Sequence, residues 1–346
     1  MTAPLYVTAW TTISPYGVGR EAFIAGVRNR RTVATTLDPA LWSGPDVQAC
    51  LVPDFDQRAE LGKKGTRTMN RVTGLMVSAV GRLAGIGGPD AGLVVGTTTG
   101  SVQSMMDFTR DSLSGDRPFD VDPMVIPNSL MNCAAAKCAI WYGIQGPNST
   151  LACGRPSGLF TLAYARRLLL NGRARTVLCA AAEEYTMARA WLDHHSRGGE
   201  PGLLGEGAVA LSVELDETPG SLAAILAVES GLLLPGADSA GLVSGLVCRA
   251  LDRAGITTAQ VWAAVPSGFH PGETRALADL FGAGASDRVP CTAELLGDTA
   301  AVSAMFQLAA ALASADDAVG RVVVLTSVDV DGMAAAAVLR LAEGAR

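Results

Sequence analysis

The sequence has few charged residues, and this scarcity narrows the range of partners. Only 17% of the 346 residues are charged and the net charge is −6, so no basic field is available to hold a nucleic-acid backbone or an anionic membrane surface. We therefore expect neither nucleic acid nor a membrane as a partner. Hydrophobic residues make up 49% of the chain. Because the chain is so apolar and has so few charges, we expect another subunit to cover part of its surface.

Paired cysteines and long apolar runs are also missing. The seven cysteines are scattered and form no CxxC pair, which excludes a zinc-ribbon pattern and favours reduced thiols in a cytoplasmic protein. No apolar stretch reaches the roughly 18 residues of a membrane span, and no leader-like segment opens the chain, so we expect neither export nor an anchor. His194 and His195 lie in the polar segment WLDHHSRGGE, expected to be a solvated loop with no third ligand nearby. No metal and no cofactor are expected.

Short β-rich runs alternate with longer Ala- and Leu-rich helical patterns, which predicts an α/β protein. The same order of patterns occurs twice, and a turn cluster from Asp216 to Gly220 separates the two series. We therefore predict two similar halves, residues 1–218 and 219–346. The periodicity predicts helices over residues 70–85, 156–171, 238–254, 273–281 and 300–314.

A strand, a tight turn and a helix follow one another around Cys153. Gly146-Pro147-Asn148 opens the strand-like STLAC, which runs into Gly154 to Gly158, and LFTLAYARRLLLNG then has helical periodicity and a glycine stop. An elbow of this kind exposes one side chain at a helix N-terminus, where the macrodipole lowers the pKa of a thiol and favours a nucleophile. The elbow is therefore the first candidate for a functional site.

The stretch GPNSTLACGRPSGLFTLAYARRLLLNGRARTVLCAAAEE resembles the nucleophile region of β-ketoacyl synthases. Further segments resemble that family in the family's order: VTAWTTISPYGVGREAFIAGVRNRRT, KGTRTMNRVTGLMVSAV, LVVGTTTGSV, PMVIPNSLMNCAAAKCAIWYGIQGP, GEGAVALSVE and ETRALADLFG. The resemblance covers most of the chain. It implies the thiolase fold, in which two similar halves stack as α-β-α-β-α layers.

The residues that carry the chemistry of this family are absent. The family needs a Cys to hold the acyl chain and two His to stabilise the charges that develop during decarboxylative condensation. A gap-free count places Arg155 at the position of the Cys, and a guanidinium is not a nucleophile at neutral pH. The loop before ETRALADLFG has no His at the expected place, and Asp298 stands at the second His position. Asp329 to Gly332 replaces a glycine-rich loop near the oxyanion region. We interpret these as four independent losses.

This pattern resembles the chain-length factor of type II polyketide synthases. The resemblance implies a subunit without activity of its own, which forms a heterodimer with a ketosynthase and shapes the tunnel for an acyl chain carried by acyl carrier protein. Well-known chain-length factors have Gln at the elbow, so Arg155 departs from their pattern. Arg155 could bind an acyl-carrier phosphate or a malonyl carboxylate, or pair with an acid across the dimer in a structural role.

Two alternatives stay open. Cys153 could serve as the nucleophile of an active thiolase-fold acyltransferase or condensing enzyme if the strand were shorter and the elbow longer than the gap-free count implies; otherwise it is a strand cysteine. The chain could also be a homodimeric binding or scaffold protein with no synthase partner.

The resemblance also suggests where a partner binds. The family's substrate tunnel is closed by residues that correspond here to Met105, Phe108, Met124 and Val125, which could equally be ordinary interface core. Lys63, Lys64, Arg67 and Arg71 form a small basic cluster. It could dock an acidic carrier protein or be a solvated helix face.

Overall fold

The computed structural model describes residues 3–83, 85–314 and 319–342. The strands of these residues are β1 (Leu5–Ser14), β2 (Gly17–Val18), β3 (Thr35–Thr36), β4 (Gln48–Cys50), β5 (Ala91–Gly96), β6 (Asn148–Leu151), β7 (Thr176–Glu183), β8 (Leu204–Gly205), β9 (Gly207–Glu214), β10 (Ala223–Leu232), β11 (Val261–Val265), β12 (Val322–Val328) and β13 (Met333–Leu341).

The α-helices are α1 (Arg20–Arg28), α2 (Gln57–Leu61), α3 (Arg71–Val80), α4 (Val102–Ser114), α5 (Cys133–Tyr142), α6 (Ser157–Leu170), α7 (Met187–Ser196), α8 (Ser239–Ala254), α9 (Pro271–Phe281), α10 (Thr292–Leu296) and α11 (Ser303–Ala313). Short 3₁₀ turns are η1 (Ile126–Ser129), η2 (Thr258–Gln260), η3 (Ala283–Ala285) and η4 (Ala300–Val302). No helix of the described residues has the length and apolar character needed to cross a bilayer.

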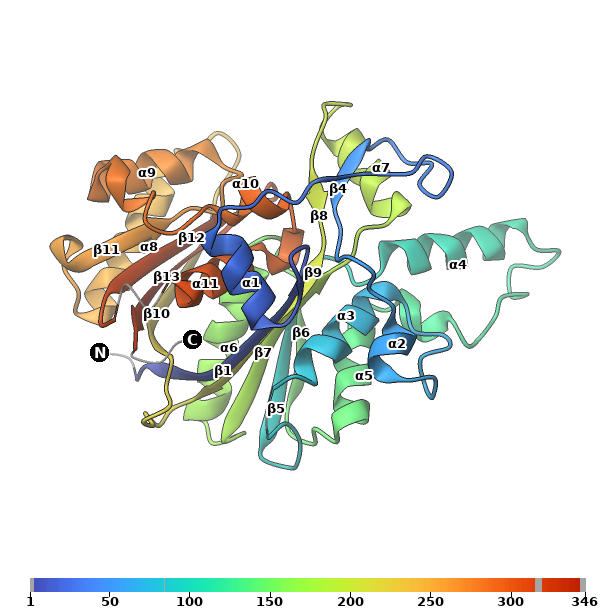
Figure 1. The fold of residues 1–346 in the computed structure, drawn as a ribbon, viewed down its shortest axis with the longest axis horizontal. Helices are drawn as coiled ribbons and strands as arrows, with labels where there is room; N and C mark the ends of the chain where they lie inside the picture. The colour runs from blue at the N-terminus through green and yellow to red at the C-terminus, as the bar shows by residue number, and fades with distance from the viewer. Residues whose placement is uncertain (1–2, 84, 315–318, 343–346) are drawn as a thin grey trace.

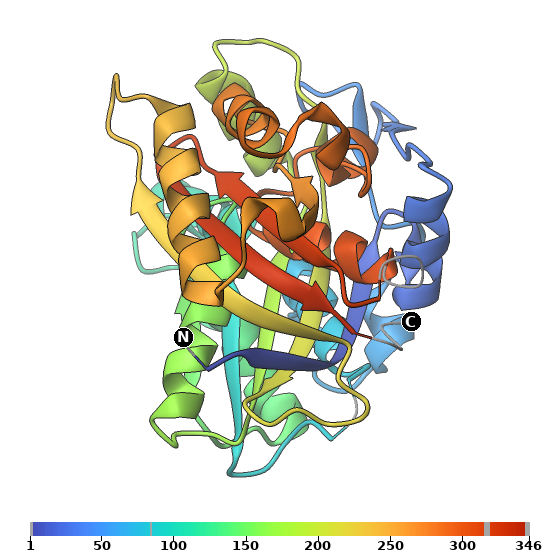
Figure 2. The same ribbon diagram turned by 90° about the vertical axis from the view of Figure 1, so that its left-hand side faces the viewer.

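One ten-stranded sheet runs through both halves of the described chain in the order β11-β12-β13-β10-β1-β9-β7-β5-β6, with β2 beside β1. The order repeats: β5, β7, β9 and β1 pair parallel, antiparallel and antiparallel, and so do β11, β12, β13 and β10. Antiparallel pairing of β1 with β10 joins the two sets. The halves are therefore similar, as the resemblance implied. In Figure 2 the yellow and red strands of the second set lie in front of the green and cyan strands of the first.

Helices form three layers around these strands (Figure 1). α3 and α5 cover the outer face of the first half, α8 and α9 cover the outer face of the second, and α6 and α11 pack between the halves. The central helix α11 is buried at every position, because both of its faces meet apolar neighbours. This is the five-layer α-β-α-β-α arrangement of the thiolase fold, and it places the N-terminus of α6 deep between the halves.

The predicted helices are confirmed with shifts at their ends. Residues 71–80, 157–170, 239–254 and 271–281 are helical, and the pattern over 300–314 divides into η4 and α11. Residue 84 of the predicted helix 70–85, and residues 1, 2, 315–318 and 343–346 of the predicted halves, lie outside the described residues. The boundary near residue 218 stays a prediction; it falls in the connection between β9 and β10.

Candidate functional site

The elbow after β6 is a tight turn whose shape depends on Gly154. This residue has φ +62°, and a Cβ at its position would lie 2.2 Å from Cγ of Asp329, so only glycine leaves room for the Asp329 carboxyl group. The Ser157 hydroxyl closes the turn because it accepts a hydrogen bond from the Cys153 N–H at 3.0 Å and donates to the Gly154 carbonyl at 2.6 Å. The turn therefore aims the residue after Gly154, which is Arg155, toward the second half of the chain.

The Arg155 side chain is 12% exposed and is bound to two carboxylates. Its Nη2 donates to Oδ2 of Asp298 at 2.5 Å, and its Nη1 donates to Oδ1 of Asp329 at 3.3 Å. The backbone N–H of Arg155 donates to the same Asp329 oxygen at 3.1 Å. The guanidinium lies over the ring of Phe269, 4.5 Å from its centroid. Arg155 is thus the centre of an ion-pair cluster whose acids belong to the same chain, which corrects the expectation of a pair across a dimer.

The second half supplies both acids of this cluster. Asp298 follows α10 and the positive-φ residue Gly297, and Asp329 comes directly after β12. Burial acts to raise the pKa of Asp298, but the charge and hydrogen bonds of Arg155 outweigh it and hold that pKa below its ordinary value. Burial also acts to lower the pKa of Arg155, and the charge of Asp298 reverses that effect. Each partner therefore favours the charged form of the other.

The four losses that we took as independent meet at one place. Arg155, expected at the Cys position, contacts Asp298, expected at the second His position, and Asp329 of the C-terminal loop. The loop in which we expected the first His contributes Phe269. These residues form an "Arg155 cluster" (Arg155, Phe269, Asp298 and Asp329) that links the two halves.

A cavity of about 380 Å³ adjoins the Arg155 cluster. Arg155 and Arg189 are the basic residues among its lining, and the Arg189 guanidinium donates to the carbonyl oxygens of Glu184, Gly205 and Asp298. The acidic residues of the lining outnumber them; they are Glu183, Asp193, Asp298, Asp329 and Asp331. The cavity is therefore negative in character.

Cys153 lies two residues before Arg155 and is partly exposed. Burial, with a smaller contribution from the charge of Asp329, raises the pKa of its thiol. A raised pKa disfavours the thiolate, which is the nucleophilic form. The local electrostatics are thus opposite to those that activate a catalytic cysteine.

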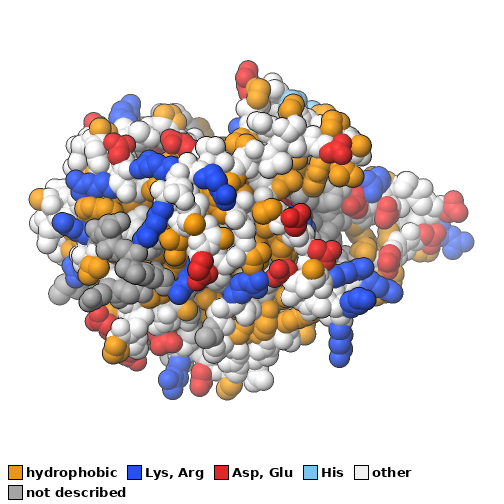
Figure 3. Space-filling model, in the orientation of Figure 1, with side chains coloured by type: hydrophobic (Ala, Val, Ile, Leu, Met, Phe, Trp, Pro, Cys, Tyr) orange, Lys and Arg blue, Asp and Glu red, His pale blue; other side chains and the backbone are white. Residues whose placement is uncertain are grey.

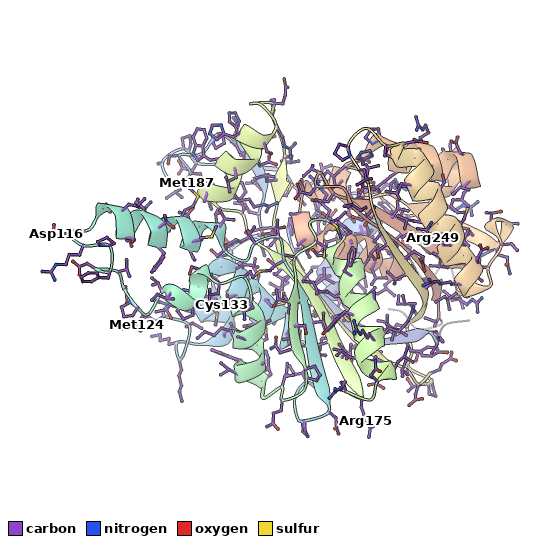
Figure 4. The ribbon with its side chains drawn as sticks, turned by 180° about the vertical axis from the view of Figure 1, so that it is seen from behind. Asp116, Met124, Cys133, Arg175, Met187 and Arg249 are labelled. Atoms are coloured by element: carbon purple, nitrogen blue, oxygen red, sulfur yellow. The ribbon has the colours of Figure 1, made fainter. Side chains whose placement is uncertain are left out.

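A second region, which we call the arm, projects away from the body and comprises residues 102–131, with α4 and η1 (Figure 1; in Figure 4 Asp116 lies near its tip). Met105 and Phe108 are on α4, and Met124 and Val125 directly precede η1. Met105 and Met124 are exposed, whereas Phe108 and Val125 are half-buried.

The sequence reasoning missed other apolar residues of the arm that are more exposed or equally so. Leu113 is 83% exposed and Phe119 is 71% exposed. Met106 and Leu113 stand seven residues apart on α4 and share one helix face. Their spacing was the signal that could have identified this face.

Two other expectations need correction. His194 and His195 are not in a loop: they form the last turn of α7, and both rings pack near Trp191. Arg71 is not part of an exposed basic cluster, because its guanidinium forms an ion pair with the buried Glu206. Lys63, Lys64 and Arg67 remain exposed, and basic side chains gather over α2 and the segment after it (Figure 3).

Comparison with known proteins agrees with this geometry. The chain belongs to the beta-ketoacyl synthase family, whose N-terminal domain model matches residues 2–198. It is similar to a chain of the solved structure of the ishigamide ketosynthase/chain length factor, with 42% identity, a TM-score of 0.93, and coverage of 98% of this chain and 99% of that one. A type II PKS acyl-carrier protein in complex with its ketosynthase, AntDE:AntF, shares the fold at 14% identity, with a TM-score of 0.81 and coverage of 99% and 100%.

Similarity to curated sequences is more limited. The 3-oxoacyl-[acyl-carrier-protein] synthase 2 of Vibrio harveyi is 26% identical over 149 residues, which are 39% of this chain and 34% of that enzyme. The corresponding enzyme of Synechocystis sp. is 25% identical over 189 residues, or 51% of this chain and 44% of the enzyme. The aligned segments span less than half of the curated relatives.

Proposed function

We propose that this chain is a chain-length-factor-like subunit that forms a heterodimer with a ketosynthase and supports decarboxylative chain elongation without catalysing it. The single observation that carries the proposal is the Arg155 cluster. The gap-free count puts Arg155 at the nucleophile position, and its guanidinium, bound to two carboxylates, cannot accept an acyl chain. The 42% identity to a chain of a ketosynthase/chain length factor structure supports the same role.

The surface of the arm supports a partner. Met105, Met106, Leu113, Phe119 and Met124 expose 44%, 45%, 83%, 71% and 53% of their surface, and an exposed group of large apolar side chains on one projection is typical of a protein interface.

A free edge of the sheet offers a second surface to a partner. β6 ends the sheet order, and no strand of the described residues lies on its other side. Its free edge can pair with a strand of a partner. The partner would therefore contact both the arm and β6.

The predicted tunnel wall is also part of the proposal: Met105, Phe108, Met124 and Val125 would limit the length of the acyl chain. Methionine side chains make such a wall adaptable. Acyl carrier protein would dock through Lys63, Lys64 and Arg67, which adjoin the wall because Nη2 of Arg67 lies 3.7 Å from Sδ of Met124. A cytoplasmic location belongs to the same proposal, supported by seven cysteines that are all free.

The test is to produce the chain alone and together with a ketosynthase that has an intact Cys and both His residues. Native mass spectrometry gives the stoichiometry, and malonyl condensation on acyl carrier protein gives the activity. We expect a one-to-one complex that is active only when both subunits are present, and longer products when Met105 is replaced by Ala.

Two controls separate the alternatives. Cys153→Ala should leave the activity of the complex within about twofold, as should Cys248→Ala at an exposed thiol. Condensation by this chain alone that is lost in Cys153→Ala would contradict the proposal and favour an active enzyme. A stable homodimer that binds and stimulates no ketosynthase would contradict the proposal and favour a scaffold protein.

A further inference from the structure

The carboxylate of Asp329 holds an unusual position for an acidic side chain. It packs directly on the elbow, where Gly154 leaves room for it. Its Oδ1 accepts from both the backbone N–H and Nη1 of Arg155, at 3.1 Å and 3.3 Å, and its Oδ2 accepts from the Asp331 N–H at 3.4 Å. Three donors thus converge on one carboxylate, as they would on a bound carboxylate ligand.

From this geometry we infer that the elbow is a carboxylate-binding site occupied by the protein's own Asp329, so that the malonyl carboxylate is excluded from this subunit. The inference rests on the proposed function, because it explains how malonyl groups would be restricted to the partner. It adds a role for Asp329 that the loss of a nucleophile does not require: an elbow without Cys could still bind malonyl groups and compete with the partner for them.

Charge and space around the cluster support exclusion. Asp298 uses Oδ2 on Nη2 of Arg155 and Oδ1 on the Ala300 N–H at 2.8 Å, so Nη1 and Nη2 are both committed to internal carboxylates. Arg197 is engaged with Asp193 at 2.8 Å and approaches Asp298 at 3.7 Å. A dianionic malonate entering the cavity would therefore meet the carboxylates of Asp193, Asp298, Asp329 and Asp331. The other guanidinium of the lining, Arg189, already donates to three backbone carbonyl oxygens.

Removing the internal carboxylate should open the site. In Asp329→Ala, the Arg155 N–H and Nη1 lose their acceptor while Asp298 still neutralises Nη2. Malonate can then bind in place of the Asp329 side chain. Hydrogen bonds to a charged group contribute enough to tighten binding at least about tenfold over the wild type. Asp329→Asn keeps a carbonyl oxygen that can occupy the same donors, so its gain should be smaller.

Isothermal titration calorimetry of the full chain measures the malonate affinity of the wild type and of each variant. Malonamide serves as the uncharged probe. Asp331→Ala is the matched control, because it removes an exposed carboxylate of the same cavity but frees no donor of Arg155. Circular dichroism of each variant confirms that it is folded. We expect detectable malonate binding in Asp329→Ala, weaker binding in Asp329→Asn, and none in the wild type or Asp331→Ala.

Two results would overturn the inference: a folded Asp329→Ala variant that binds malonate no better than Asp331→Ala, or a wild-type chain that binds malonate as tightly as Asp329→Ala. The titration needs no ketosynthase, so its outcome is separate from that of the proposed function. If no heterodimer forms but malonate binding follows the expected order, the proposed function fails while the self-occupied site stands.

Discussion

The Arg155 cluster buries charged side chains, whereas the arm exposes apolar ones. In the cluster, a guanidinium and two carboxylates are buried and are partners of one another. In the arm, Met106, Leu113 and Phe119 are apolar and exposed to water. A protein that catalyses its own reaction keeps reactive groups accessible and apolar groups covered. Here the internal cluster is closed by ion pairs and the apolar surface is open, as the proposed role of a partner subunit requires.

The largest expected effect is on partner binding and comes from placing charges on the arm. Met106→Asp combined with Leu113→Asp places two charges on the apolar face of α4. If a ketosynthase covers this face, both charges lose water on binding, and we expect association to weaken at least about 100-fold. Surface plasmon resonance with the immobilised ketosynthase measures the change.

Leu41→Asp combined with Leu232→Asp is the matched control for the arm, because these residues are 75% and 54% exposed and lie outside it. The control pair should bind like the wild type. Unchanged binding of the arm variant would show that the partner occupies another surface.

The next largest effect is on stability and comes from removing the cation of the Arg155 cluster. Arg155→Met leaves Asp298 and Asp329 buried without their cation, and breaking a buried ion pair of this kind costs about 3–5 kcal/mol of unfolding free energy. Adding Asp298→Asn and Asp329→Asn should recover much of the loss, because no unpaired charge remains. Urea denaturation measures all three proteins. Arg110→Met is the control: its ion pair with Asp107 is largely exposed and should contribute below about 1 kcal/mol.

Acid should reduce the difference between wild type and Arg155→Met. The pKa of Asp298 is lowered in the folded chain, from an ordinary value of 3.8. The contribution of ionised Asp298 to the free energy of unfolding is therefore fully present above that value. It is lost as the pH falls through the pKa of the folded chain. In Arg155→Met the acids lack their cation, and protonation relieves the unpaired charges. A difference in stability that stays constant from pH 7 to pH 3 would contradict the role of Arg155 as their counter-ion.

Helix periodicity and strand patterns predicted the elements well because they are local properties, and the resemblance to β-ketoacyl synthases implied the thiolase fold. It also identified Arg155, Asp298 and Asp329 as departures from the family's pattern. It could not predict that they bind one another, because Arg155 is 143 residues from Asp298 and 174 from Asp329, and pairing over such distances is set by the packing of the two halves. The exposure of Met106 and Leu113 is likewise a tertiary property, since an apolar helix face normally predicts burial.

The error at His194 and His195 has a local cause. The polar composition and the glycines that follow suggested a loop, but Thr186 caps the helix N-terminus by accepting a hydrogen bond from the Arg189 N–H. Trp191 then packs near both imidazoles. Capping by Thr186 and aromatic contacts within α7 thus outweighed the loop-like composition.

The smallest predicted effect concerns Glu184, which lies between the two regions. Its carboxyl group accepts from the Ser101 hydroxyl at 2.6 Å, at the N-cap of α4, and from the Val72 N–H at 2.8 Å. Burial raises its pKa from 4.5 to about 7. The folded chain therefore holds this proton over a pH range in which the unfolded chain has released it, so stability falls as the pH rises from 5 to 8.

Glu184→Gln should remove this pH dependence, because an amide does not titrate. Relative to the wild type, the variant should gain ~1–3 kcal/mol of unfolding free energy between pH 5 and pH 8. Urea denaturation at both pH values measures the gain, with Glu200→Gln at an exposed carboxyl as the control. Parallel changes in Glu184→Gln and Glu200→Gln would mean that Glu184 is already ionised at pH 5. The expected gain would instead show that the base of the arm is held by a neutral carboxylic acid, so that alkaline pH loosens the surface that the partner needs while the Arg155 cluster keeps its charges.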